Sequence, residues 1–189
     1  MNITALVNLH LHSYLVHNGL ERSAFEHLAR QIDEGQDLQD RRNFDGHVTS
    51  SFALLNPERT HLLMIYHLGF DLWLFPGGHY EGRVPPRTSA IRELEEETGF
   101  PAELVGWFDH IDYVALDIDT HDIPERPSKN EDAHVHHDFL YLGVALDHAN
   151  LTHQVEEVAE AKWISLEDAA LLPDPRMQRA MDKILKLLN

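Results

Sequence analysis

The sequence contains no cysteine, which excludes disulfides, thiolate nucleophiles and thiolate metal sites. It is also poor in positive charge, and its formal net charge is −17. Such a chain repels polyphosphate backbones, so we expect no nucleic acid polymer as a partner; a small anionic substrate would need metal ions to screen it. No apolar run approaches a membrane span, and the N-terminus lacks the order of a secretion signal. We therefore expect a cytoplasmic protein with no membrane partner.

With 189 residues, 43% of them hydrophobic, the chain suits one domain with a small appendage. Helical spacing of apolar residues predicts a first helix over residues 3–17, and a capping box from Ser23 to Glu26 predicts a second one that ends at Gly35. We expect residues 1–43 to form an N-terminal helical extension on a main domain of residues 44–189, or to pack on a second subunit. The extension's histidines, expected to lie on the surface or between helices, are His10, His12 and His17.

Residues 44–189 alternate between strand and helix signals. Predicted strands cover residues 47–55, 60–67, 70–75, 103–109, 113–123, 133–146 and 162–164. Helices are expected from Pro86, after Ser165 and over residues 175–188, and residues 123–132 should form a loop. This order predicts an α+β fold, with a central mixed sheet between helices.

A glycine turn and an acidic helix occupy residues 76–100. Glu93, Glu96 and Glu97 have the spacing that places them on one helix face, and Gly99 is suited to end the helix. Like charges at this spacing are destabilising, and carboxylates near a helix C-terminus oppose the macrodipole. A hard divalent cation, Mg²⁺ or Mn²⁺, would compensate them. An ordinary solvated glutamate face is the alternative.

The surrounding residues resemble the signature of the Nudix hydrolase family, in which Gly, five residues, Glu and seven residues precede Arg-Glu-apolar-x-Glu-Glu-x-Gly-apolar. The resemblance covers residues 44–168, and the N-terminal helices lie outside it. The places of the signature that match are filled by Gly78, Arg92, Glu93, Leu94, Glu96, Glu97, Gly99 and Phe100. One place departs, because Val84 stands where the family has its first glutamate.

The resemblance implies an α/β/α sandwich and a pyrophosphohydrolase that uses Mg²⁺ or Mn²⁺. The implied metal ligands are Glu93, Glu96, Glu97 and the Gly78 carbonyl oxygen. The family's catalytic base varies, so Glu93, Glu96 or a glutamate on a distant loop could activate the water. Family members often add a loop ligand before the last strand, for which Glu157 is our choice and Glu156 and Glu160 are alternatives; an ordinary acidic loop remains open.

The departure at Val84 concerns Arg92, which the family's glutamate is expected to brace. Glu81 could replace that partner, or Glu95 from the same helix. We therefore expect Arg92 and Glu81 to support the motif. The departure puts the position of the catalytic loop in doubt more than metal binding, because the metal glutamates remain.

Two later segments carry alternating polar residues. If a loop near residues 127–128 joins them as a hairpin, His121 lies opposite His136 and Asp119 opposite Asp138, in one polar stripe. A transition-metal site is conceivable there, but solvated or hydrogen-bonded strand residues are favoured. Because a similar strand occurs in Nudix proteins of unassigned substrate, we also consider a substrate wall made of His134, His136 and Asp138.

The leading hypothesis is a divalent-metal-dependent hydrolase of a diphosphate linkage in a small nucleoside diphosphate derivative. The alternative is a non-catalytic Nudix-fold sensor, against which the intact glutamates argue. Isoprenyl diphosphate isomerases share the fold but rely on a cysteine, which this chain lacks. The sequence names no single substrate, and a homodimer would be unsurprising.

Overall fold

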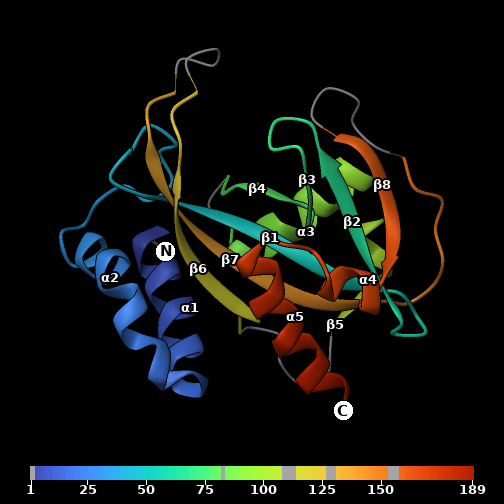
Figure 1. The fold of residues 1–189 in the computed structure, drawn as a ribbon. Coiled ribbons are helices and arrows are strands. Elements are labelled where there is room, and N and C mark those ends of the chain that lie inside the picture. The colour runs from blue at the N-terminus through green and yellow to red at the C-terminus, as the bar shows by residue number, and fades with distance from the viewer. Residues whose placement is uncertain (1–2, 82–83, 108–113, 127–130, 153–157) are drawn as a thin grey trace.

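The computed structural model describes residues 3–81, 84–107, 114–126, 131–152 and 158–189, and within them one mixed sheet of eight strands forms the centre (Figure 1). A path β3-β2-β1-β7-β5 crosses the sheet, while β4 pairs with β1, β6 with β7 and β8 with β2. Only the β1–β7 pair among these is parallel. The strands are β1 (His47–Leu55), β2 (His61–His67), β3 (Leu72–Leu74), β4 (Gly77–His79), β5 (Val105–Trp107), β6 (Asp117–Ile123), β7 (His134–Ala145) and β8 (Val158–Ser165).

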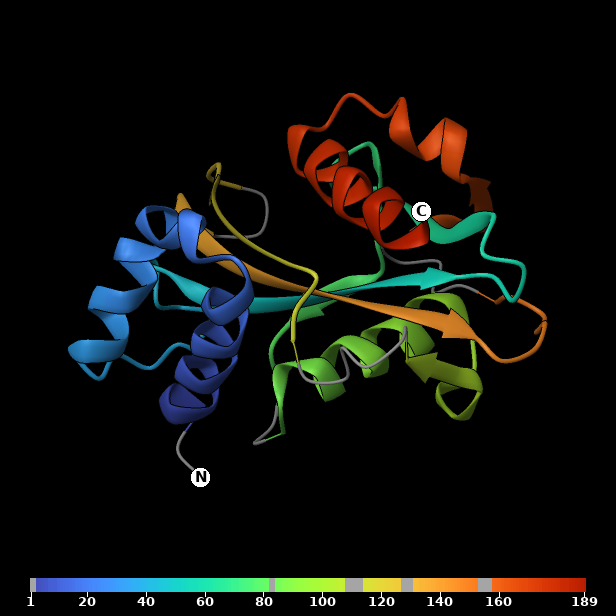
Figure 2. The ribbon, with the colours of Figure 1, turned by 90° about the horizontal axis from the view of Figure 1, so that it is seen from below.

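Helices cover both faces of this sheet. Figure 2 shows α3 on one side of the strands and α4 with α5 on the other, while α1 and α2 lie at one end. This is the α/β/α sandwich that the sequence predicted. The α-helices are α1 (Ile3–His17), α2 (Glu26–Asp33), α3 (Pro86–Thr98), α4 (Leu166–Ala170) and α5 (Pro175–Leu188), and two 3₁₀ helices span Gly19–Phe25 and Ala102–Leu104. Within the described residues, no helix is both long and apolar enough to cross a bilayer.

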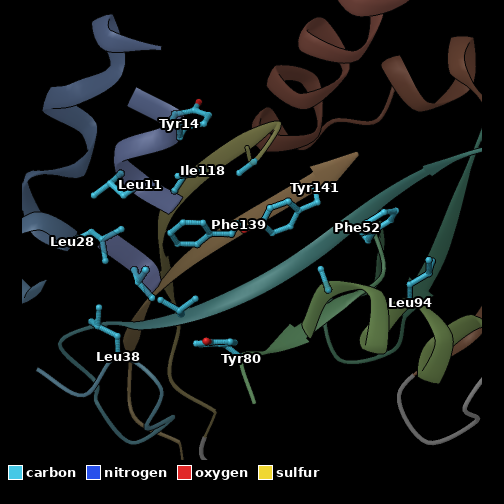
Figure 3. Close-up of a cluster of buried hydrophobic side chains, with 14 of the residues drawn as sticks. Leu11, Tyr14, Leu28, Leu38, Phe52, Tyr80, Leu94, Ile118, Phe139 and Tyr141 are labelled. Atoms are coloured by element: carbon cyan, nitrogen blue, oxygen red, sulfur yellow. The ribbon is translucent and has the colours of Figure 1, made fainter. Parts of the chain in front are cut away.

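Alternation along β1 and β7 sends apolar side chains to both faces of the sheet. On the α3 side, Phe52 and Phe139 join a buried cluster with Leu94 of α3 (Figure 3). The same cluster includes Leu11 and Tyr14 of α1, so the N-terminal helices and the sheet share one core. On the opposite face, a second cluster packs the apolar side of α5 against β1, β2 and β7; its members include Leu55, Met64, Leu142, Met177 and Met181.

Polar contacts also tie the N-terminal helices to the sheet and to α5. The Tyr141 hydroxyl lies 2.8 Å from His10 Nδ1 in a buried contact, as expected for a helix-packing histidine. Lys183 of α5 donates to Tyr14, Glu21 and Asp117. The other two histidines of α1, His12 and His17, are exposed.

Most predicted elements are confirmed, and α1, β1 and α5 have the predicted bounds. The capping box is wrong: Ser23 lies inside a 3₁₀ helix, and α2 begins at Glu26 without a side-chain cap. Burial of Phe25, whose ring packs edge-to-face on Tyr14 at 5.7 Å, outweighs the local capping signal. The predicted strand at 103–109 begins with a 3₁₀ turn, and β8 is longer than the predicted strand at 162–164.

Strand β4 is a further difference, because the sequence predicts a turn at residues 76–78. Gly77 and Gly78 instead pair with Ser51 and Ser50 of β1. A Cβ at Gly77 would lie 2.4 Å from Ser51 Oγ and 2.8 Å from the Ser50 carbonyl oxygen. Glycine is therefore required here by close backbone approach within a sheet, which a turn pattern does not reveal.

Candidate functional site

A cleft of about 1270 Å³ gathers the polar groups that the sequence singled out. The acidic residues of α3, the glycines of β4, the hairpin of β6 and β7 and the first turn of α5 all contribute to its walls. The predicted site residues that line it are Gly78, Glu81, Arg92, Glu93, Glu96, Glu97, His134, His136 and Asp138. Residues that are distant in sequence therefore meet in one open cleft.

Helix α3 places Glu93 and Glu97 against β4, and Glu96 lines the same cleft. Pro86 at the first helical position suits a helix start, and Gly99 ends the helix with φ of 67°. Glu97 is 7% exposed, and its Oε2 accepts a hydrogen bond of 2.8 Å from the Gly77 backbone N–H. This bond holds Glu97 against the glycine strand and fixes how the helix and β4 meet.

Glu93 lies one turn earlier and packs on Gly78. Its side chain is 13% exposed, and a Cβ at Gly78 would lie 2.7 Å from Glu93 Oε2. Burial raises the pKa of Glu93 to about 7, although Arg92 opposes this effect. Glu93 therefore can gain or lose a proton near neutral pH, unlike an ordinary surface glutamate.

Arg92 takes partners from the motif itself. Its guanidinium bonds Glu93, lies 2.9 Å from Glu96 Oε2 and 3.8 Å from Glu81 Oε2. Glu81 is thus a partner as predicted, but Glu95 is not, because Glu95 accepts the Ala102 N–H instead. Val84, in place of a charged residue, packs on the core, and its carbonyl accepts a hydrogen bond from Tyr80.

The predicted hairpin register is confirmed, with His121 opposite His136 and Asp119 opposite Asp138. Asp138 Oδ1 accepts hydrogen bonds from Thr49 (2.8 Å) and Ser51 (3.0 Å) on β1. Burial raises the pKa of Asp138, because few solvent contacts stabilise its charged form. The stripe thus continues across β1 and forms the floor of the cleft.

Cations of α5 neutralise the other end of the stripe. Arg179 lies 2.7 Å from Asp117 and 2.6 Å from Asp119, and Lys183 lies 2.8 Å from Asp117. Although burial opposes ionisation, hydrogen bonds from His121 and Arg179 lower the pKa of Asp119 to about 2. These aspartates are therefore paired structural anions, and the α3 glutamates retain the less compensated charge.

Comparison with known proteins identifies the family of this chain. The sequence profile of the NUDIX domain matches residues 46–188, which is most of the chain. The chain belongs to the Nudix family. A probable DHNTP pyrophosphohydrolase from Lactococcus lactis subsp. cremoris is 34% identical over 69% of this chain and 70% of its own length.

Other Nudix relatives differ in length and detail. A CMP-5'-(N-acetyl-N-hydroxy-3-aminopropyl)phosphonate hydrolase from Streptomyces rubellomurinus is 29% identical over 65% of this chain, and the match spans about half, 54%, of that protein. An Ap4A hydrolase structure from C. elegans covers 75% of this chain and 96% of its own, with a TM-score of 0.59 and 16% identity, which shows a shared fold. Family membership and the first relative support the predicted enzyme class, a Nudix-type pyrophosphohydrolase.

The α3 donor set of this Nudix chain fits a hard divalent cation. Its side chains offer only carboxylate oxygens, the ligands that Mg²⁺ and Mn²⁺ prefer. Glycine at position 78 leaves no side chain between the Glu93 carboxylate and the β4 backbone. The Gly78 carbonyl as a ligand stays a prediction.

The position of the predicted loop ligand of the Nudix site is not described by the structure. Glu157 and its alternative Glu156 lie outside the described residues. The other alternative, Glu160, lies on β8, 3.7 Å from Lys162, and is not among the residues that line the cleft in the described part of the chain.

Several cleft residues were missed by sequence reasoning. Thr49 and Ser51 are two residues apart on β1, so their polar side chains point to the same face of the strand. His79 follows the glycine pair, where the sequence predicts a turn, and Arg126 lies between the two prolines in the sequence of the predicted loop. No local pattern marks Arg126, which reaches the cleft only through the tertiary fold.

Proposed function

We propose that this Nudix protein is a divalent-metal-dependent hydrolase of a diphosphate linkage in a small nucleoside diphosphate derivative. The observation that carries the proposal is that the three α3 glutamates and the two β4 glycines line one cleft. The family membership supplies the reaction class. A cytoplasmic location and a homodimer stay predictions.

Glu93, Glu96 and Glu97 would hold the cation, together with the Gly78 carbonyl and Glu157. When bound, Mg²⁺ or Mn²⁺ supplies charge neutralisation at phosphate oxygens and an acidified water. Arg92 holds Glu96, and the Gly77 N–H holds Glu97, so the carboxylates are oriented in advance. Glu93 or Glu96 takes the proton of the attacking water; the raised pKa of Glu93 suits that role.

The far part of the cleft can hold the rest of the substrate. Arg126 lines it, with its guanidinium 4.0 Å above the Phe70 ring. Arg126 Nη2 is buried and has no hydrogen-bond partner in the part of the chain that the structure describes. A planar cation on an aromatic ring suits a phosphate or a nucleobase. His134, His136 and Asp138 would form the opposite wall.

The two curated relatives narrow the substrates worth testing. One is described as acting on DHNTP and the other on a CMP-linked phosphonate. The first panel should hold DHNTP, a CMP-linked compound, ADP-ribose, nucleotide sugars, dinucleoside polyphosphates and nucleoside triphosphates. Each is assayed for phosphate-containing products with Mg²⁺ and with Mn²⁺, and we expect turnover of at least one.

Replacing Glu96 or Glu97 by Gln should abolish metal-dependent turnover without unfolding, since each change removes a ligand charge and little volume. The matched control is Glu95→Gln, on the same helix, whose side chain accepts the Ala102 N–H. Activity and thermal melting of the three variants are compared with the parent chain. Retained turnover in both Glu96→Gln and Glu97→Gln would sink the proposal.

A non-catalytic sensor remains the second candidate, because Val84 alters the Nudix signature. A sensor would bind one member of the panel in calorimetry and release no product from any of them. In that case neither the parent chain nor Glu96→Gln would form product, whereas an enzyme would lose product formation in Glu96→Gln.

A further inference from the structure

Five histidines gather at one end of the cleft, on four strands. The His47 ring of β1 is stacked between the rings of His79 (5.3 Å between centroids) and His134 (5.1 Å). His136 meets His47 across the parallel β1–β7 pair, with ring centroids 4.7 Å apart, and His121 approaches His136 from β6. A cluster of this kind outside the glutamate site calls for its own explanation.

His47 is the buried centre of the cluster and is only 1% exposed. Its Nδ1 lies 3.2 Å from the Asn43 carbonyl oxygen, which can only accept, so Nδ1 carries the proton. The other nitrogen, Nε2, is buried and finds no hydrogen-bond partner among the described residues. An unsatisfied buried acceptor costs roughly 1–3 kcal/mol, so a partner for this lone pair would be stabilising.

Three of the rings bring one nitrogen each close together. One nitrogen each of His47, His79 and His136 lies within 4.8 Å of the other two. Ligand nitrogens of a tetrahedral Zn²⁺ site are about 3.3 Å apart, given Zn–N bonds of about 2.0 Å. Small side-chain rotations therefore close the site, while the paired strands β1, β4 and β7 keep its frame.

We propose that His47, His79 and His136 bind one transition-metal cation of the Zn²⁺ type, separately from the α3 glutamates. Imidazole suits such ions, whereas Mg²⁺ prefers oxygen ligands. His79 and His136 line the cleft, so the ion lies at the cleft wall. Three protein ligands leave a coordination position, which water or a substrate oxygen can take.

A purely hydrogen-bonded cluster accounts for fewer of these observations. It explains His134 and His136, whose Nε2 atoms are 3.0 Å apart. It leaves His47 Nε2 without a hydrogen-bond partner among the described residues. Burial lowers the pKa of His47 to about 4 and also lowers that of His79, so both rings are neutral at pH 7, as ligands must be.

The test is a titration of the metal-stripped full chain with Zn²⁺, and with Co²⁺ as a coloured probe, in saturating Mg²⁺. We expect one Zn²⁺ per chain and Co²⁺ absorption typical of nitrogen ligands. His79→Gln and His136→Gln should each weaken binding by at least about 100-fold, because even outer-shell losses cost roughly 10- to 100-fold. The matched control, His12→Gln, changes an exposed histidine of α1 and should bind like the parent.

Unchanged Zn²⁺ binding in both cluster variants would overturn the site. So would binding that is lost in Glu97→Gln and kept in His79→Gln, since that pattern assigns the ion to α3. Should a variant fail to fold, X-ray absorption of the Zn²⁺-loaded parent decides. Imidazole nitrogens at about 2.0 Å support the site, and an all-oxygen shell contradicts it.

Discussion

At position 78, the absence of a side chain determines where the Glu93 carboxylate can lie. The glycine leaves room for the Glu93 carboxylate, and a Cβ there would lie 2.7 Å from Oε2 and 2.8 Å from Cδ. The obstructed atoms are the end of a flexible side chain, so the helix need not move. The carboxylate must move instead.

Gly78→Ala should therefore impair activity more than stability. Displacing Glu93 by about 1 Å is expected to lower kcat/KM by about 100-fold, while thermal melting changes little. The matched control is Gly19→Ala, where an added Cβ would meet no described atom within 4 Å. Steady-state kinetics on the best panel substrate measure the difference. Equal activity of the two variants would contradict the assigned position of Glu93.

At the same scale, sequence reasoning could find the carboxylates but not all of their partners. Glu93, Glu96 and Glu97 have fixed spacing on one helix, so periodicity alone brings them together. The partners of Arg92 depend on rotamers and on the tertiary fold, so spacing alone does not distinguish Glu81, which lies 3.8 Å from Arg92, from Glu95, which accepts the Ala102 N–H. The orphaned nitrogen of His47 is a property of burial, which sequence spacing does not record.

At the scale of single elements, the C-terminus of α3 is held by a glycine in a left-handed conformation. Gly99 adopts φ of 67°, a conformation that costs other residues roughly 1–2 kcal/mol. A Cβ there would also lie 2.1 Å from Thr152 Oγ1 and 3.0 Å from the Thr152 backbone nitrogen. The Thr152 N–H donates to the Thr98 carbonyl, so this close approach locks the helix end to a later loop.

Gly99→Ala should lower the free energy of unfolding by about 2–5 kcal/mol, from backbone strain plus a clash of about 1–3 kcal/mol. Gly35→Ala is the control, because Gly35 has a similar φ of 69° but no atom of the described residues near its Cβ position. It should cost only about 1–2 kcal/mol. Urea unfolding measures both, and equal losses would show that the contact with Thr152 contributes nothing.

Element prediction succeeded where periodicity was long and failed where tertiary contacts decide. Helix α5 and strand β1 carry regular patterns over many residues, and their bounds match. Strand β4 is three residues long and consists mostly of glycine, so no local pattern predicts it; pairing with β1 and the hydrogen bond from Gly77 to Glu97 hold it in place. The start of α2 is set by the burial of Phe25 and not by the capping-box pattern.

For the whole molecule, the main feature is one core shared by the N-terminal helices and the sheet. Leu11, Tyr14 and Leu28 belong to the same buried cluster as Phe52 and Phe139 (Figure 3). We propose that residues 1–43 form an integral helical extension on the main domain of residues 44–189. Removing the extension would expose that cluster to solvent.

This shared core also predicts acid sensitivity. Burial, assisted by Arg87, lowers the pKa of His10 to about 4 from 6.5, so the unfolded chain binds the proton more readily. The stabilisation is complete above pH 6.5 and is lost as pH falls towards 4. At pH 5, the loss from His10 should be about 2 kcal/mol. Unfolding free energies of the parent and of His10→Asn are measured from pH 7 to pH 5.

The His10→Asn variant should lose about 2 kcal/mol less than the parent across that interval. His12→Asn, an exposed change on the same helix, should follow the parent curve. Parallel curves for all three chains would show that His10 is not protected from protonation by the fold.

The parallel pairing of β1 with β7 also governs how the protein reaches its folded state. Thr49 and Asp138 share a hydrogen bond although 89 residues separate them along the chain. Closing so long a loop costs chain entropy before any contact repays it, and such topologies fold slowly. Helices and hairpins can form early, but the cleft floor exists only after this late closure. Regain of ligand binding during refolding should therefore lag behind regain of helical signal, and a fragment that lacks either strand has no cleft to offer.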